Sequence, residues 1–206
     1  MMIKVCGLKN REDILKCDSL GVDFLGFIFF DKSPRCVDPL IFKDLPDLKA
    51  KRVGVFVDKR PSEITKFIDL ARLDYVQLHG DYSLEDCKFL GKERVIKVLW
   101  PERYSDFKKF QEEILMYKDV CSYFLIDSGL SLGGHGRPLV CSWIREIYFP
   151  KKWFLAGGIG PHNVLELIFK LNPDGVDINS SVELAPGKKD INAIVDVLNI
   201  VSRYSL

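Results

Sequence analysis

Cysteine and aspartate stand at the ends of two short apolar runs in this chain. Cys6 closes the run Ile3-Lys4-Val5-Cys6, and Asp127 closes the run Tyr123-Phe124-Leu125-Ile126-Asp127. A thiol becomes a useful base when its surroundings promote ionisation, and a partly desolvated carboxyl group has a raised pKa that suits a general acid. The pair therefore predicts proton-transfer chemistry. From position alone, packing for Cys6 and a turn cap for Asp127 stay open as alternatives.

Residues that could hold an anion follow three other apolar runs. Arg35 comes after the run from Phe24 to Phe29, and its guanidinium suits bidentate binding of a carboxylate or phosphate, although a solvated loop arginine is the alternative. Glycine permits close backbone approach and serine hydroxyls add donors. The later segment Gly157-Gly158 supplies the glycines and Ser180-Ser181 supplies the hydroxyls. Together the two segments favour a phosphorylated substrate. Asp177 ends a strand-like run beside the second, where catalysis and a structural hydrogen bond to loop amides are both open.

Eight strand-like runs position these residues. They begin near residues 3, 23, 52, 75, 95, 123, 153 and 175, and helical periodicity lies between them. This alternation predicts an α/β fold, a single (β/α)8 TIM barrel, in which active-site residues lie at the C-terminal ends of several strands. An open doubly wound sheet is the competitor, but it would have fewer strands and a Gly-rich loop after the first, where this chain has only Gly7.

Helix signals support the same alternation. An apolar stripe follows Pro61, Ser83 and Asp86 form a capping box, and Pro161 is expected to open a later helix. Asn10 or Asp13 is expected to cap the first helix. The segment 39–48 is a weak helix because Pro46 interrupts it. The Gly-rich stretch 128–138 predicts an active-site loop rather than a domain boundary.

Composition narrows the class of protein. The 206 residues are 47% apolar and 29% charged with a net charge of +1, which predicts one globular domain over residues 1–206 and no nucleic-acid partner. The absence of a long apolar run predicts no membrane span, and the chain is expected to be cytoplasmic. The six cysteines form no C-x-x-C pair and have no histidine at zinc-finger spacing. We expect no metal and no cofactor.

Dispersed motifs in the right order resemble the phosphoribosylanthranilate isomerase family of the tryptophan pathway. The resemblance runs through nearly the whole chain and implies a (β/α)8 barrel without a cofactor. The stretches that carry it are Lys4-Val5-Cys6-Gly7-Leu8, Gly26-Phe27, Ser33-Pro34-Arg35, Val53-Gly54-Val55-Phe56-Val57, Val76-Gln77-Leu78-His79-Gly80, Leu155-Ala156-Gly157-Gly158, and Val176-Asp177 with Ser180, Val182 and Glu183.

The resemblance implies an isomerase that carries out the Amadori rearrangement of N-(5-phosphoribosyl)anthranilate to 1-(2-carboxyphenylamino)-1-deoxyribulose 5-phosphate. Asp127 falls on the general acid that protonates the ribose ring oxygen, and Cys6 on the general base that takes the proton from C2. Arg35 matches the residue that holds the anthranilate carboxylate, while the glycine and serine loops anchor the phosphate. The implied partner is this small phosphorylated substrate, bound by a monomer or homodimer.

Three departures from the family pattern bear on substrate affinity. Lys9 stands where threonine is usual, Ser181 stands where glycine is usual, and the loop reads Gly133-Gly134-His135-Gly136-Arg137 with Trp143 arriving later. His79 ends the fourth strand-like run and could face the mouth of the barrel, but a structural histidine is the favoured interpretation. Indole-glycerol-phosphate synthase is a related barrel whose lysine-based site has no matching pattern here. A barrel that only binds phosphate is the non-enzymatic alternative, against which the intact Cys6 and Asp127 argue.

Overall fold

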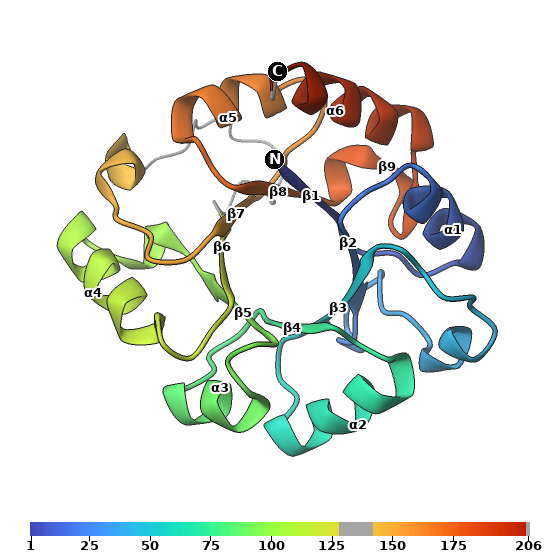
Figure 1. Cartoon of the computed structure of the whole chain (residues 1–206), viewed down its shortest axis with the longest axis horizontal. Coiled ribbons are helices and arrows are strands. Elements are labelled where there is room, and N and C mark those ends of the chain that lie inside the picture. Colours follow the sequence, from blue (N-terminus) through green and yellow to red (C-terminus); the bar gives the residue numbers. More distant parts are fainter. Residues whose placement is uncertain (128–141, 205–206) are drawn as a thin grey trace.

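A closed barrel of eight parallel strands forms the centre of the molecule (Figure 1). The computed structural model describes residues 1–127 and 142–204. The predicted Gly-rich loop and its departures at 133–137 therefore lie outside the described residues. The barrel strands are β1 Met2–Val5, β2 Phe24–Ile28, β3 Lys51–Phe56, β4 Tyr75–Leu78, β5 Val95–Leu99, β6 Tyr123–Asp127, β7 Trp153–Ala156 and β8 Gly175–Ile178.

The strands pair in sequence order, and β1 closes the barrel against β8. In that closing pair Lys4 is level with Asp177, and Val5 is level with Ile178. Every strand starts within about one residue of the position that its apolar run predicts. The prediction of a TIM barrel over an open doubly wound sheet is therefore confirmed.

Helices cover the outside of the barrel (Figure 1). Asn10 caps the first of them by accepting a hydrogen bond from the Asp13 backbone, and Ser83 and Asp86 form the predicted capping box. The segment 39–48 forms only a short 3-10 helix, in line with its weak pattern. The α-helices are α1 Arg11–Ser19, α2 Pro61–Ala71, α3 Leu84–Leu90, α4 Phe107–Tyr117, α5 Val164–Leu171 and α6 Ile191–Tyr204; the 3-10 helices are η1 Pro39–Lys43, η2 Pro101–Arg103, η3 Ser142–Glu146 and η4 Ser180–Val182.

The start of α5 differs from the prediction that Pro161 opens this helix. The helix begins at Val164, and the three preceding residues form a turn. The Asn163 side chain explains the delay, because it accepts from the Gly160 backbone and donates to the Gly158 carbonyl. These bonds hold the chain after β7 in a tight loop before the helix starts.

Strand alternation divides the core into two parts. Side chains at alternate positions point into the barrel, where Phe24 makes edge or tilted ring contacts with Tyr75, Tyr123 and Phe154. The intervening side chains point outward and pack under the helices in a larger apolar cluster. The aromatic cluster lies among the early residues of its strands, so it fills the barrel below the C-terminal ends.

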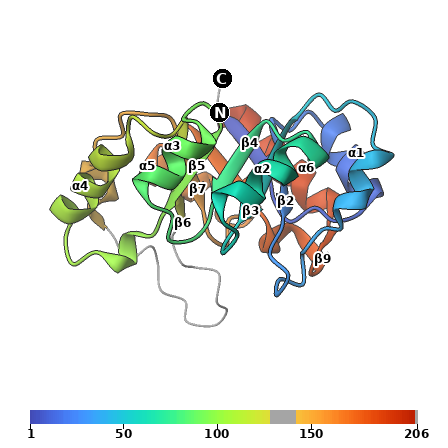
Figure 2. The same cartoon turned by 90° about the horizontal axis from the view of Figure 1, so that it is seen from below.

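A small hairpin of β9 (Glu183–Ala185) and β10 (Lys188–Lys189) follows β8. Figure 2 shows β9 at the end of the molecule opposite the N-terminus, which is the end where the barrel strands finish. The same end carries the residues predicted to do chemistry. Within residues 1–127 and 142–204, no helix is long and apolar enough to cross a membrane.

Candidate active site

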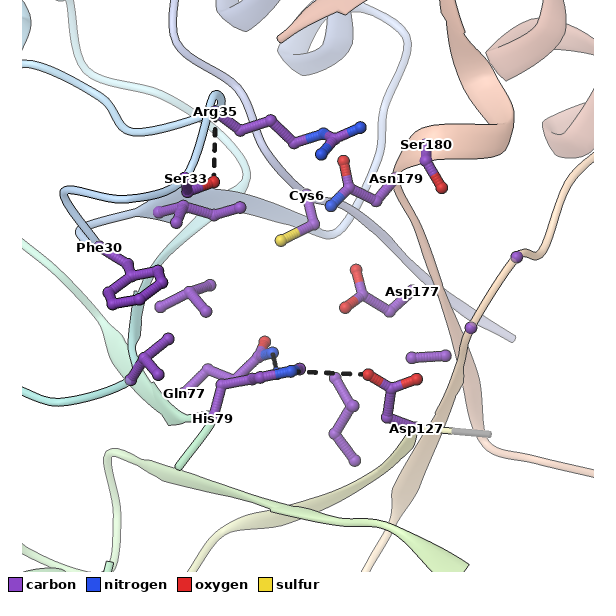
Figure 3. A pocket seen from close by; sticks show the side chains of 17 residues that line it. Cys6, Phe30, Ser33, Arg35, Gln77, His79, Asp127, Asp177, Asn179 and Ser180 are labelled. Carbon is purple, nitrogen blue, oxygen red and sulfur yellow. Dashed lines mark hydrogen bonds and ion pairs between the residues drawn. The ribbon is translucent and has the colours of Figure 1, made fainter. Parts of the chain in front are cut away.

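A cavity of about 340 Å³ opens at the C-terminal end of the barrel. Among the described residues, the wall of this cavity includes residues from, or directly after, every barrel strand except β5. The predicted site residues that line it are Cys6, Arg35, Asp127, Gly157, Gly158, Asp177 and Ser180, and Figure 3 shows Cys6, Asp127 and Asp177 directed toward its centre.

Cys6 follows β1 directly, and its backbone N–H donates to the Ile178 carbonyl at 2.9 Å. The residue is only 4% exposed. Burial is the main reason why the pKa of its thiol is raised, while the ammonium groups of Lys4 and Lys189 act in the opposite direction. The thiol is thus a strong base once ionised, and its neighbours decide how readily it ionises.

Asp127 ends β6, and β7 and β8 separate it from β1. Its Oδ2 lies 3.6 Å from Nε2 of His79, and Gln77 Nε2 lies 3.4 Å from the other ring nitrogen of that histidine (Figure 3). Burial lowers the pKa of His79 to about 4, so its ring is neutral near pH 7. The structure therefore places His79, interpreted from sequence as structural, beside the candidate acid in the cavity wall.

Asp177 and Lys4 form an ion pair inside the barrel. Lys4 Nζ lies 2.9 Å from Asp177 Oδ2, and both side chains are buried. Asp177 Oδ1 is also buried and has no hydrogen-bond partner among the described residues. Burial raises the pKa of Asp177, and Lys4 offsets part of that increase. The structural bond of Asp177 is thus made to Lys4 and not to the loop amides considered from sequence, and Asp177 also lines the cavity.

Arg35 is held by a second cluster of charges. Its Nε and Nη2 donate to the Glu183 carboxylate, the latter at 2.6 Å, and Lys189 Nζ donates to the same carboxylate at 2.8 Å. Although burial alone would raise the pKa of Glu183, these bonds lower it. Gly7 permits the close approach, because its φ is +75° and an added Cβ would lie 2.9 Å from Arg35 Cδ. Glu183 thus holds one edge of the Arg35 guanidinium, and the Nη1 of that group bonds to no residue that the structure describes.

The loops after β7 and β8 face the cavity with small residues. Gly157 and Gly158 adopt φ of 101° and 63°, a backbone region that favours glycine. Gly158 and Ser180 line the cavity, whereas Ser181 is not among the lining residues and its Cβ packs toward Gly160. Of the predicted phosphate-binding residues, Ser181 is therefore the one that the structure does not bring to the cavity.

Two departures from the family pattern have a structural role outside the cavity. Lys9 lies over Gly187 in the β9–β10 turn and donates to the Pro34 carbonyl at 3.0 Å. Trp143, in η3, packs against Phe110 of α4 with ring centroids 5.4 Å apart. Lys9 thus ties the hairpin to the segment that carries Arg35.

Sequence reasoning missed several charged and polar groups at the site. Lys4 had a usable signal, because a lysine two residues before Cys6 on the same strand must point to the same side. Glu183 belongs to the motif that carries the family resemblance, but the motif does not reveal its bond to Arg35. Lys189 had no signal, since its position depends on the fold of the hairpin. Among the described residues, no group of three or more His, Cys, Asp or Glu side chains is arranged to hold a metal ion.

Comparison with known proteins places these residues in a family context. The family model described as N-(5′-phosphoribosyl)anthranilate (PRA) isomerase matches residues 3–200. The N-(5′-phosphoribosyl)anthranilate isomerase of Maridesulfovibrio salexigens is 44% identical over 94% of this chain and 95% of its own. The crystal structure of phosphoribosyl anthranilate isomerase from Thermotoga maritima superimposes with a TM-score of 0.83 at 32% identity, covering 98% and 99% of the two chains.

A further solved structure of the same enzyme contains a bound ligand. It is a complex with reduced 1-(o-carboxyphenylamino)-1-deoxyribulose 5-phosphate, and it superimposes with a TM-score of 0.75 at 30% identity over the whole of both chains. That ligand carries both a carboxylate and a phosphate. The relative therefore binds a molecule with the two anionic groups that the cavity residues of this chain are suited to hold.

Proposed function

The chain belongs to the N-(5′-phosphoribosyl)anthranilate isomerase family, and from this premise we propose how its cavity carries out the reaction. The protein is an isomerase of tryptophan biosynthesis that converts N-(5-phosphoribosyl)anthranilate to 1-(2-carboxyphenylamino)-1-deoxyribulose 5-phosphate. The observation that carries the assignment of roles is that Cys6 and Asp127 line one cavity together with Arg35 and the small-residue loops.

Asp127 acts as the general acid. It donates a proton to the ribose ring oxygen as the C1–O bond breaks, and the nitrogen lone pair completes an iminium ion. Cys6 acts as the general base and removes the proton from C2, so that the electrons of the C–H bond neutralise the iminium and give an enolamine. Tautomerisation of the enolamine gives the ketone. The two groups reach the substrate from different strands, which suits separate protonation and deprotonation of one bound molecule.

Arg35 and the loops after β7 and β8 hold the two ends of the substrate. The guanidinium donors left free by Glu183 suit the anthranilate carboxylate, and backbone N–H groups near Gly157 and Gly158 with the Ser180 hydroxyl suit the phosphate. Asp177 lines the same cavity, and its carboxylate is proposed to bind a sugar hydroxyl.

The test of the function is a turnover assay with phosphoribosylanthranilate generated in situ. Conversion to the aminodeoxyribulose product is the expected result. Binding of substrate without conversion, in a sample whose folding is verified by circular dichroism, would instead support a barrel that only binds phosphate.

Arg35→Lys should raise KM by about tenfold or more and leave kcat within a few-fold of wild type. An ammonium cannot bind Glu183 and a carboxylate with the planar fork of a guanidinium, and the loss falls on binding that is the same in ground and transition states. Steady-state kinetics with Arg60→Lys, an exposed arginine of the α2 cap, provides the control. An unchanged KM would show that Arg35 serves only its bond to Glu183.

Inorganic phosphate should bind between the loops after β7 and β8. Ser180→Ala should weaken this binding by about tenfold, the order expected for one hydrogen bond to a charged group. Ser181→Ala is the matched control, because Ser181 does not line the cavity, and it should change the affinity little. Calorimetric titration of both variants checks this, and equal losses in the two would contradict the placement of the phosphate.

The organisation of the protein follows from the same reasoning. We propose that residues 1–206 form one TIM-barrel domain, which is supported by eight strands that pair into one closed barrel. The protein is proposed to act in the cytoplasm without a cofactor, as a monomer or homodimer. Sedimentation equilibrium distinguishes these two states.

A further inference from the structure

The proposed chemistry does not use Lys4, although this lysine is fully buried inside the barrel. Its side chain is 0% exposed and donates to Asp177, which lies level with it on the neighbouring strand β8. An ion pair in the interior is costly to desolvate and is weak evidence for a stabilising role. Lys4 therefore calls for an explanation other than stability.

Lys4 and Cys6 share a small space beside β2. They lie two residues apart at the end of β1, so both side chains point into the barrel. An added Cβ on Gly26 of β2 would lie 2.8 Å from Cys6 Sγ and 3.1 Å from Lys4 Nζ. The sulfur and the ammonium thus lie next to the same gap that this glycine leaves. A thiolate there would be close enough to the ammonium for a strong electrostatic attraction.

Three charged groups act on Cys6 from the elements packed against it. Lys4 of β1 and Lys189 of β10 favour the thiolate, while Asp177 of β8 opposes it. The Lys189 ammonium already donates to the Glu183 carboxylate, to Asn179 Oδ1 and to the Asn179 carbonyl, so its three donor positions are occupied. Among the described residues, Lys4 has one carboxylate partner, Asp177, which occupies one of its three donor positions.

We propose that Lys4 is the counter-ion that the Cys6 thiolate takes when it forms, and that Asp177 competes with the thiolate for the same ammonium. Lys4 is then a positioning residue for the base: it sets how much thiolate exists, while Cys6 moves the proton. This proposal depends on the proposed function in one respect: the proposed function is what makes the Cys6 thiolate the catalytic base.

The proposal predicts effects of opposite sign for the two members of one ion pair. Lys4→Met removes the counter-ion and leaves Asp177, so the pKa of Cys6 should rise further. Asp177→Asn removes the competitor and leaves Lys4 to the sulfur, so that pKa should fall. If the pair were purely structural, both variants would lose stability in the same way, because either change leaves one buried charge without its partner.

The experiment is the pH dependence of alkylation of Cys6 by iodoacetamide, followed by mass spectrometry of the peptide that contains Cys6. The thiolate is the reactive form, so the rate constant at a pH below the pKa is proportional to the thiolate fraction. Relative to wild type at neutral pH, Lys4→Met should react at least about tenfold more slowly and Asp177→Asn at least about tenfold faster, which is one pKa unit in each direction.

Lys97→Met is the matched control. Lys97 is another buried strand lysine, but it donates to the Tyr82 carbonyl and lies over the Tyr117 ring, on the outer side of β5. Its replacement should leave the alkylation of Cys6 unchanged. If Lys4→Met does not fold, Lys4→Met/Asp177→Asn keeps the pair neutral and should react at least about tenfold more slowly than Asp177→Asn alone.

Two results would overturn the proposal: equal pH profiles in wild type and Lys4→Met, or shifts in the same direction for Lys4→Met and Asp177→Asn. Neither depends on turnover. Conversely, full turnover by a protein that lacks the Cys6 thiol would refute the role of Cys6 as base and leave the alkylation result standing, so the two failures are distinguishable.

Discussion

Cys6→Ser should lower turnover by roughly 10² to 10⁴ while folding and binding of the product stay nearly unchanged. A serine hydroxyl ionises far less readily than a thiol, so it cannot replace the base even with Lys4 beside it. The change is small in volume, and the Cys6 backbone bond to Ile178 is unaffected. The loss should therefore fall on kcat. Steady-state kinetics together with product binding by calorimetry measures the two parts separately.

Cys36→Ser is the control for this substitution. Cys36 is a partly exposed thiol on the segment after β2 and does not line the cavity. Its replacement should leave turnover near the wild-type value. Turnover of Cys6→Ser within about threefold of wild type, against an expected general-base loss of at least ~10², would rule out Cys6 as the base.

Asp127→Asn should lower turnover by roughly 10² or more. The amide keeps the size of the carboxyl group and its place beside His79, but it has no acidic proton to give to the ring oxygen. Asp81→Asn, at an exposed loop position paired with Arg103, is the control and should have little effect.

The pH profile sharpens this prediction. Wild-type activity should follow a bell-shaped curve against pH, because one group must be protonated and the other deprotonated. The two apparent pKa values of this curve belong to the pair of groups and not to either residue alone. The raised pKa of Cys6 places the ionisation of the base on the alkaline side. In Asp127→Asn only this ionisation remains, so the residual activity should rise with pH and lack a declining limb. A variant that keeps a bell-shaped profile and near-normal turnover would leave Asp127 as a turn cap.

The barrel could be predicted from sequence because each of its strands is a local apolar run. Even the helix caps at Asn10 and Ser83 depend on neighbours within three residues. The error at Pro161 arose from a side chain two residues later: the bonds of Asn163 to the preceding loop delay the helix, and proline alone does not reveal them.

The candidate site was predictable only in part, for a related reason. Cys6, Asp127 and Gly158 could be placed because each ends a strand, and barrel strands end together. The partners that tune these residues come from distant segments: Glu183 reaches Arg35 across 148 positions, and Asp177 reaches Lys4 across 173. Local patterns carry no information on such pairs, and the placement of Ser181 away from the cavity likewise depends on its contact with Gly160.

The seam between β1 and β8 also determines when the thiol becomes protected. Cys6 is synthesised long before β8, the strand to which its backbone bonds. Until then the thiol is in water with its ordinary acidity, and oxidation of cysteine follows exposure and thiolate character. The nascent chain is therefore more vulnerable to oxidants than the finished enzyme, and a redox insult during translation would damage new molecules before existing ones.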